Sequence, residues 1–157
     1  MQRPAPGLTA AFVPGLIAGL LGGVLIDVYL ILTVVVVRHA IDLTTFFQVV
    51  ASGLLGEAAF TDPASVWVGV AIHLVVSLAW GVGYAYVAAG APQVLARPLA
   101  SGIVFGLIVY VAMGALAGAA GAFRALTPLA LLNAAVAHTL FFGIPIAFYV
   151  SRRLRPA

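Results

Sequence analysis

Cysteine, lysine and charge in general are scarce in this chain of 157 residues. Cysteine is absent, which excludes disulfides, thiolate metal sites, iron–sulfur clusters and covalent c-type haem attachment. Lysine is absent too, so the net charge of +3 comes from Arg alone, and seven scattered Arg are too few for a nucleic-acid surface. Only 7% of the residues are charged, whereas a soluble domain has about 25%.

Apolar sequence takes the place of charge. Hydrophobic residues make up 64% of the chain, more than a soluble fold of this size can bury, so lipid is expected to be its main solvent. The first apolar run, from Leu8 to Val37, is much longer than a signal-peptide core of about 7–15 residues. We therefore predict that it is a retained transmembrane helix.

Four segments have the length that crossing a bilayer requires, about 20 apolar residues. They cover residues 8–37, 65–90, 99–120 and 128–151. The predicted fold is all-α: one transmembrane domain over residues 1–157, built as an integral membrane bundle of four transmembrane helices.

The link between the first two spans holds a shorter apolar segment, residues 42–56. Asp42 is a candidate N-cap, and Gly53 and Gly56 are typical stop signals. Because the segment is too short to span, it is predicted to be an interfacial or re-entrant helix. A membrane-surface connector and a ligand lid or partner surface remain alternative roles for it.

Orientation follows from the positions of the arginines, which favour the cytoplasmic side. Five lie on the side of the two termini: Arg3, Arg97, Arg152, Arg153 and Arg155. Two lie on the other side: Arg38 and Arg124. Both termini are therefore predicted to be cytoplasmic.

Each predicted span carries small residues at intervals of four, which places them on one helix face. Such rows let membrane helices approach closely. The predicted packing glycines are Gly15, Gly19, Gly23, Gly69, Gly81, Gly102, Gly106, Gly114 and Gly118. Four polar residues fall on the same rows and are expected to face protein rather than lipid: Asp27, His73, Tyr110 and His138.

Counted along the spans, these four residues lie roughly 12–15 Å below the outer boundary, which predicts one intramembrane polar layer. An aspartate at a helix centre costs about 2.5–3.5 kcal/mol, so Asp27 is expected to pair, and His73 or His138 is its simplest partner. The predicted supporting residues are Ser77, Tyr84, Tyr149 and Asn133. The layer is either interhelical glue, worth about 0.6 kcal/mol per residue, or a functional site for a ligand, metal, haem or proton.

A weak internal repeat joins the two halves. GLIAGL at 15–20 resembles GIVFGL at 102–107, and a Tyr follows each of the two histidines by eleven residues. Two parallel copies of a two-helix unit would make His73 and His138 symmetry mates, suited to a b-type haem. With Asp27 they would also form a two-His, one-carboxylate metal set.

The fourth span has its own irregularity, FFGIPIAFY at 141–149. Pro145 cannot donate a hydrogen bond to the Phe141 carbonyl, and Gly143 is flexible, so a kink is expected just inward of His138.

Three stretches, VVASGLLGEAAF, VGVAIHLVVSLAWGVGYAYV and AHTLFFGIPIAFYVSRR, together resemble small four-span bacterial inner-membrane proteins of unknown function. The likeness covers residues 45 to 153. It consists of an A-S-G-L-L-G loop, a His in the second span, and a His followed by G-I-P in the fourth. The resemblance implies the bundle, a bacterial cytoplasmic membrane and the choice of the two histidines. It implies no activity.

The leading hypothesis is a non-catalytic membrane subunit or scaffold that packs against other membrane proteins or itself, with the lipid bilayer as its surroundings and no nucleic acid. No nucleophile–base–orienter set and no phosphate-binding glycine loop point to an enzyme. One alternative is a redox or ligand-binding protein holding haem b, a metal or a quinone at the polar layer. Another is a small oligomeric transporter or proton path.

Overall fold

The computed structural model describes residues 8–119 and 127–155, and all secondary structure in these ranges is helical. The all-helical prediction is therefore confirmed for this part of the chain. The elements are α1 (Leu8–Leu30), η1 (Ile31–Val37), α2 (Leu43–Leu55), η2 (Gly56–Phe60), α3 (Ser65–Gly90), α4 (Pro92–Ala96), α5 (Pro98–Ala119), α6 (Pro128–Val136), η3 (Ala137–Gly143) and α7 (Ile144–Leu154). Two of them, η1 and η3, are π-helical and continue the helices beside them, while η2 is a 3₁₀-helix.

Five helical segments of the described chain are long and apolar enough to cross a membrane. They are Thr9–Val37, Leu43–Phe60, Ser65–Gly90, Pro98–Leu116 and Pro128–Leu154. The count exceeds the predicted four because α2 and η2 together reach 18 residues. By length and composition, the protein is an integral membrane protein.

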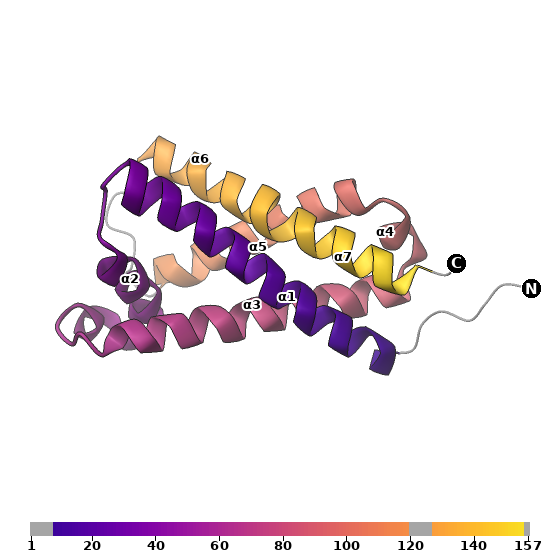
Figure 1. Ribbon diagram of the computed structural model, residues 1–157, viewed down its shortest axis with the longest axis horizontal. Helices are drawn as coiled ribbons and strands as arrows, with labels where there is room; N and C mark the ends of the chain where they lie inside the picture. The colour runs from indigo at the N-terminus through magenta and orange to yellow at the C-terminus, as the bar shows by residue number, and fades with distance from the viewer. Residues whose placement is uncertain (1–7, 120–126, 156–157) are drawn as a thin grey trace, which may run out of the picture.

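The long helices run along the long axis of the molecule (Figure 1). At one end lie α2 and the start of α3. At the other end lie α4, the start of α1 and the end of α7.

The helix α2 begins and ends as its sequence predicts. Asp42 is the N-cap, and its Oδ1 accepts a hydrogen bond of 2.7 Å from the Thr45 amide. Gly56 is the C-cap, with a φ of 59° that a side chain would strain. The helix packs on α3 where the Phe47 backbone touches Gly69 so closely that a methyl group there would clash.

Helices α1 and α3 form a first helix pair, packed antiparallel through glycines. A methyl group on Gly19 would lie 2.5 Å from the Ser77 carbonyl oxygen and 2.8 Å from the Leu78 Cα. One on Gly15 would lie 2.7 Å from the Val82 Cα. Only glycine permits this backbone approach, as the small-residue rows predict.

Helix α5 and the continuous η3–α7 helix form a second helix pair with the same contacts. A methyl group on Gly106 would lie 2.5 Å from the His138 carbonyl oxygen and 2.6 Å from the Thr139 Cα. One on Gly102 would lie 2.8 Å from the Ile144 Cα. The GLIAGL and GIVFGL glycines therefore occupy equivalent positions, and the molecule contains a two-helix unit twice.

The register of this repeat differs from the predicted one. Gly19 contacts the Ser77 carbonyl, and its equivalent Gly106 contacts the His138 carbonyl, so Ser77 and His138 occupy equivalent positions. Four residues earlier in each helix, His73 is equivalent to Ala134. The two histidines are therefore not symmetry mates. The eleven-residue spacing between His and Tyr arises by chance in a sequence composed mainly of a few residue types. The glycine contacts are the better guide to the register, because they show which backbone segments meet.

A π-helical insertion distinguishes the second copy of the two-helix unit from the first. Ser77 and Val82 are five positions apart, but their counterparts His138 and Ile144 are six apart, so η3 holds one extra residue. Pro145 explains its place, because the missing N–H leaves the Phe141 carbonyl without its usual helical donor. The irregularity predicted there thus takes the form of a π-helix.

The first and second helix pairs pack against each other through aromatic rings and alanines. A methyl group on Gly22 of α1 would lie 2.9 Å from the side chain of Ile146 on α7, so these helices also pack tightly. The ring of Phe105 lies 4.7 Å from that of Tyr84 and 6.1 Å from that of Phe142. Gly114 makes no such approach, since a methyl group there would meet no described atom within 4 Å. The surroundings of Gly118 fall outside the described residues.

Candidate functional site

Asp27 and His73 form a polar contact between α1 and α3. The Asp27 Oδ2 lies 3.2 Å from the His73 Nδ1, so the expected pairing of Asp27 with a histidine is present. The row of small residues explains it: Gly23, one turn before Asp27, meets the Ser77 side chain, one turn after His73. The two side chains are 25% and 23% exposed, which places them at the edge of the interface rather than deep within it.

The other carboxylate oxygen of Asp27 is the one buried side-chain polar atom without a hydrogen-bond partner among the described residues. Buried polar atoms are nearly always bonded, because an unmade bond costs about 1–3 kcal/mol. Asp27 Oδ1 is therefore free to accept a bond, or to carry a proton, without disturbing the His73 contact.

Tyr110 and His138 form a separate contact between α5 and η3. Their ring centroids lie 5.9 Å apart, with a tilt of 56°. The His138 Nδ1 lies 2.8 Å from the Ala134 carbonyl oxygen, one turn earlier in its own helix. Because a carbonyl only accepts, Nδ1 must carry a hydrogen, which leaves Nε2 as the acceptor of the neutral ring.

The structure thus brings the four predicted site residues together as two pairs. In the register of the repeat, however, each pair occupies a place that is apolar or small in the other copy. Asp27 corresponds to Gly114, and Tyr110 corresponds to Gly23.

This arrangement bears on two specific expectations, the symmetry-related histidines and the three-residue metal set. The bis-imidazole haem hypothesis assumed that the two histidines are symmetry mates, and they are not. The described residues contain no group of three or more His, Cys, Asp or Glu that could hold a metal ion. The two-His, one-carboxylate set of Asp27, His73 and His138 is therefore not assembled.

Asn133 belongs to a third polar contact, one that joins α6 to α1 and η1. The Tyr29 hydroxyl donates to Asn133 Oδ1 at 2.9 Å, and Asn133 Nδ2 donates to Thr33 Oγ1 at 3.3 Å. The Tyr29 ring also stacks on Phe141 with centroids 4.1 Å apart. The sequence signal overlooked in the prediction was Tyr29 and Thr33, two polar residues four apart near the end of the first span.

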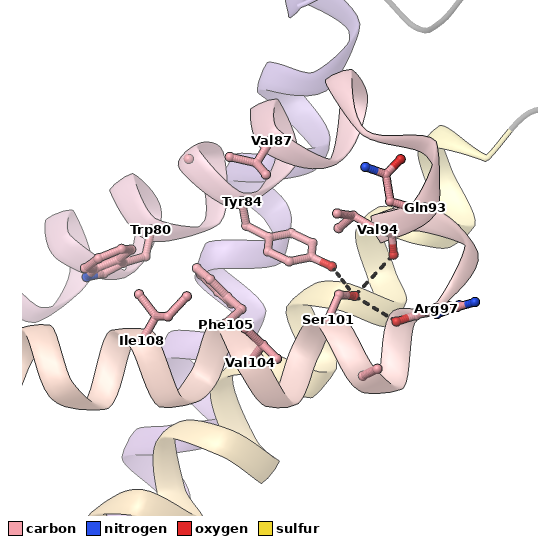
Figure 2. Close-up of a pocket in the computed structure, with 12 residues that line it drawn as sticks. Trp80, Tyr84, Val87, Gln93, Val94, Arg97, Ser101, Val104, Phe105 and Ile108 are labelled. Atoms are coloured by element: carbon pink, nitrogen blue, oxygen red, sulfur yellow. Dashed lines mark hydrogen bonds between the residues drawn. The ribbon is translucent and has the colours of Figure 1, made fainter.

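Tyr84 and Tyr149 make contacts outside these pairs, and Tyr84 lies near α4. The Tyr84 hydroxyl lies 2.8 Å from Ser101 Oγ, which is also 3.2 Å from the Val94 carbonyl oxygen and 3.0 Å from that of Arg97 (Figure 2). The Tyr149 ring lies 5.3 Å under the Arg153 guanidinium. These residues stabilise the end of the bundle and are not part of the predicted polar layer.

Helix α4 is fixed to α7 by hydrogen bonds that the sequence did not suggest. Ser151 Oγ and Arg155 Nη2 donate to the Leu95 carbonyl oxygen at 2.7 and 2.8 Å. The carbonyls of a short helix need such donors because its own turns leave them unpaired.

No protein-family model, no curated protein and no solved structure matches this chain.

Proposed function

We propose that this protein is a four-span component of a bacterial cytoplasmic membrane that acts as a non-catalytic subunit or scaffold, packing against partner membrane proteins or a second copy. The resemblance stated for residues 45 to 153 is consistent with this placement.

The packing of α1 against α3 supports the four-span arrangement. These neighbours are antiparallel, since Gly15 meets Val82 while Gly19 meets Ser77. The end of α1 and the start of α3 therefore lie on one side of the membrane, and a single crossing by α2 between them is incompatible with that. A helix in the outer interface fits, because α2 lies at that end of the bundle (Figure 1).

The arginines support the orientation. Arg97, Arg152, Arg153 and Arg155 lie in or beside α4 and α7, at the end where α1 starts (Figure 1). Arg38 follows η1 at the opposite end, next to α2. Arg3 and Arg124, which also contributed to the predicted orientation, lie outside the described residues.

One observation carries the scaffold proposal: the side chains that suggested ligand chemistry lie in contact with each other or with the backbone, and Asp27 Oδ1 is the one buried side-chain polar atom of the described residues that has no hydrogen-bond partner. Asp27 binds His73, and His138 binds the Ala134 carbonyl. The Asp27–His73 contact joins two helices, as polar contacts between membrane helices do. The outward faces meanwhile carry large apolar residues that neighbouring membrane helices can cover, such as Val75, Val111 and Leu132.

Site-specific photocrosslinking in native membranes tests this proposal. A crosslinker is placed in turn at Val28, Val75, Val111 and Leu132, which are exposed and lie in α1, α3, α5 and α6. A subunit gives protein adducts of defined mass from one or two neighbouring positions, and two differently tagged copies separate self-association from a different partner. Lipid adducts alone from every position would overturn the proposal.

Asp27 Oδ1 favours a second candidate, a proton path through the membrane. A buried carboxylate oxygen with no described partner, beside a histidine, is the arrangement that proton relays use. Proton uptake into vesicles containing the protein measures it. This candidate requires flux that Asp27→Asn abolishes and Asp42→Asn leaves unchanged, and absence of flux in the unaltered protein eliminates it.

A further inference from the structure

A groove runs between α3 and α5 at the α4 end of the bundle. Its volume is about 600 Å³, within the range of small-molecule sites. Figure 2 shows the side chains that line it: Trp80 and Ile108 lie toward one end, Tyr84 and Phe105 at its middle, and Gln93 and Arg97 at the other end.

The groove is polar at one end only. From Trp80 to Val87, and from Ser101 to Ile108, the walls extend over about 10 Å of helix and present mainly apolar side chains. Gln93 and Arg97 lie at the α4 end, where the Tyr84 hydroxyl is already occupied by Ser101. A matching ligand therefore has an apolar chain and a polar head at one end.

The charge at the polar end is positive. Arg97 is exposed there, and Arg155 reaches the Leu95 carbonyl of the same short helix. None of the four acidic residues of the chain lies in α4, α5 or α7, since all of them precede Ser65. An anionic head meets arginine here without a competing carboxylate.

We propose that the α3–α5 groove binds one anionic phospholipid, with a stretch of acyl chain against Trp80, Phe105 and Ile108 and the phosphate at Arg97. Arginine suits this role because its planar guanidinium forms paired hydrogen bonds to phosphate oxygens. A phospholipid matches the groove better than a partner helix does, because the lining is apolar along its length and basic at one end only.

The two tryptophans of the chain allow a direct test. Trp80 lines the groove, whereas Trp67 is exposed at the other end of α3. The variant Trp67→Phe leaves Trp80 as the sole tryptophan. It is reconstituted into phosphatidylcholine vesicles containing a small fraction of phosphatidylglycerol or phosphatidylcholine brominated in mid-chain, because bromine quenches indole fluorescence on contact. We expect a preference of about fivefold for the brominated phosphatidylglycerol at Trp80.

Four further variants assign that preference. Trp80→Phe, which reports Trp67, is expected to show no preference between the two lipids. In the Trp67→Phe background, Arg97→Gln is expected to remove the preference, Arg97→Lys to keep part of it, and Arg152→Gln to leave it unchanged. Equal quenching of Trp80 by both lipids, or a preference that survives Arg97→Gln, would overturn the proposal.

Gly83 tests the groove itself. It lines the groove, and a methyl group there would meet no described atom within 4 Å, so the side chain of Gly83→Leu starts in open space and occupies part of the groove. This variant is expected to reduce quenching of Trp80 by both brominated lipids. Gly114→Leu, which also points into open space but lies outside the groove, is the matched control and is expected to have no effect. Full quenching in Gly83→Leu would contradict an acyl chain in the groove.

Discussion

The two helix pairs share their backbone contacts and differ in their polar residues. Gly15 and Gly19 of the first pair approach the same backbone atoms of the neighbouring helix as Gly102 and Gly106 of the second. The distances from a Cβ built on each glycine to the matched backbone atoms agree within 0.2 Å. The Asp27–His73 contact, in contrast, has Gly114 and Ala134 as its counterparts. The glycine contacts within each pair are therefore a property of the repeated fold, whereas the Asp27–His73 and Tyr110–His138 contacts each belong to one pair only.

The largest expected effect tests the shared part. Gly81→Ala places a methyl group 2.5 Å from the Gly19 backbone, and Gly143→Ala does the same against Gly106 at 2.7 Å. Since backbone cannot give way, each variant is expected to lose about 3 kcal/mol of unfolding free energy. Denaturant titration of the protein in detergent measures it.

Gly83→Ala is the control for these variants, because its methyl group meets open space. It is expected to be neutral or to gain up to about 1 kcal/mol from higher helix propensity. Equal losses at Gly81 and Gly143 support two equivalent pairs. A loss at only one of them would break the equivalence.

Next in size is the contact that only the first pair has. His73→Ala removes the partner of Asp27 and leaves a carboxylate in an apolar interface, with an expected loss of about 2–3 kcal/mol. Adding Asp27→Ala removes that carboxylate, so the double variant should be more stable than His73→Ala alone. Simple additivity in the double-mutant cycle would show that the 3.2 Å contact contributes nothing.

The second pair is expected to respond more weakly. His138→Ala loses the bond to the Ala134 carbonyl, which the chain can replace in part, and the Tyr110 ring contact. The expected loss is about 1 kcal/mol, and it should add to that of His73→Ala because the two residues share no direct contact. The same denaturant titration measures both. A strong coupling between the two histidines would instead indicate one common site.

The comparison also explains what the sequence could predict. Glycines at intervals of four and long apolar runs are periodic, so they located the helices and most of the close approaches. They also indicated that Asp27 pairs with a histidine, but not which of His73 and His138 it is. The predicted match of His73 with His138 is wrong by four residues, since His73 is equivalent to Ala134. Residues four apart share a helix face, so a periodic pattern does not distinguish these two registers. The α3–α5 groove was not predicted either, since it depends on how two non-neighbouring helices diverge around Phe105.

The smallest expected effect concerns α2, which has no counterpart in the second pair. The Thr45 backbone amide, which donates to Asp42, and then the Thr45 hydroxyl lower the pKa of the Asp42 carboxyl below its usual value of 3.8. A carboxyl whose pKa is lower in the folded state stabilises that state above the unfolded pKa, and this contribution is lost as the pH falls through the folded pKa. The first turn of α2 should therefore fray as the pH falls below 3.8, which faster amide hydrogen exchange at Thr45 and Phe46 reports after correction for the intrinsic rate.

Asp42→Asn keeps a capping side chain without the titration, so its exchange should not depend on pH in this range. Asp62→Asn, at the start of α3, is the control and should leave the behaviour of α2 unchanged. Fraying at low pH that persists in Asp42→Asn would mean that another titrating group, and not this cap, controls the stability of the first turn of α2.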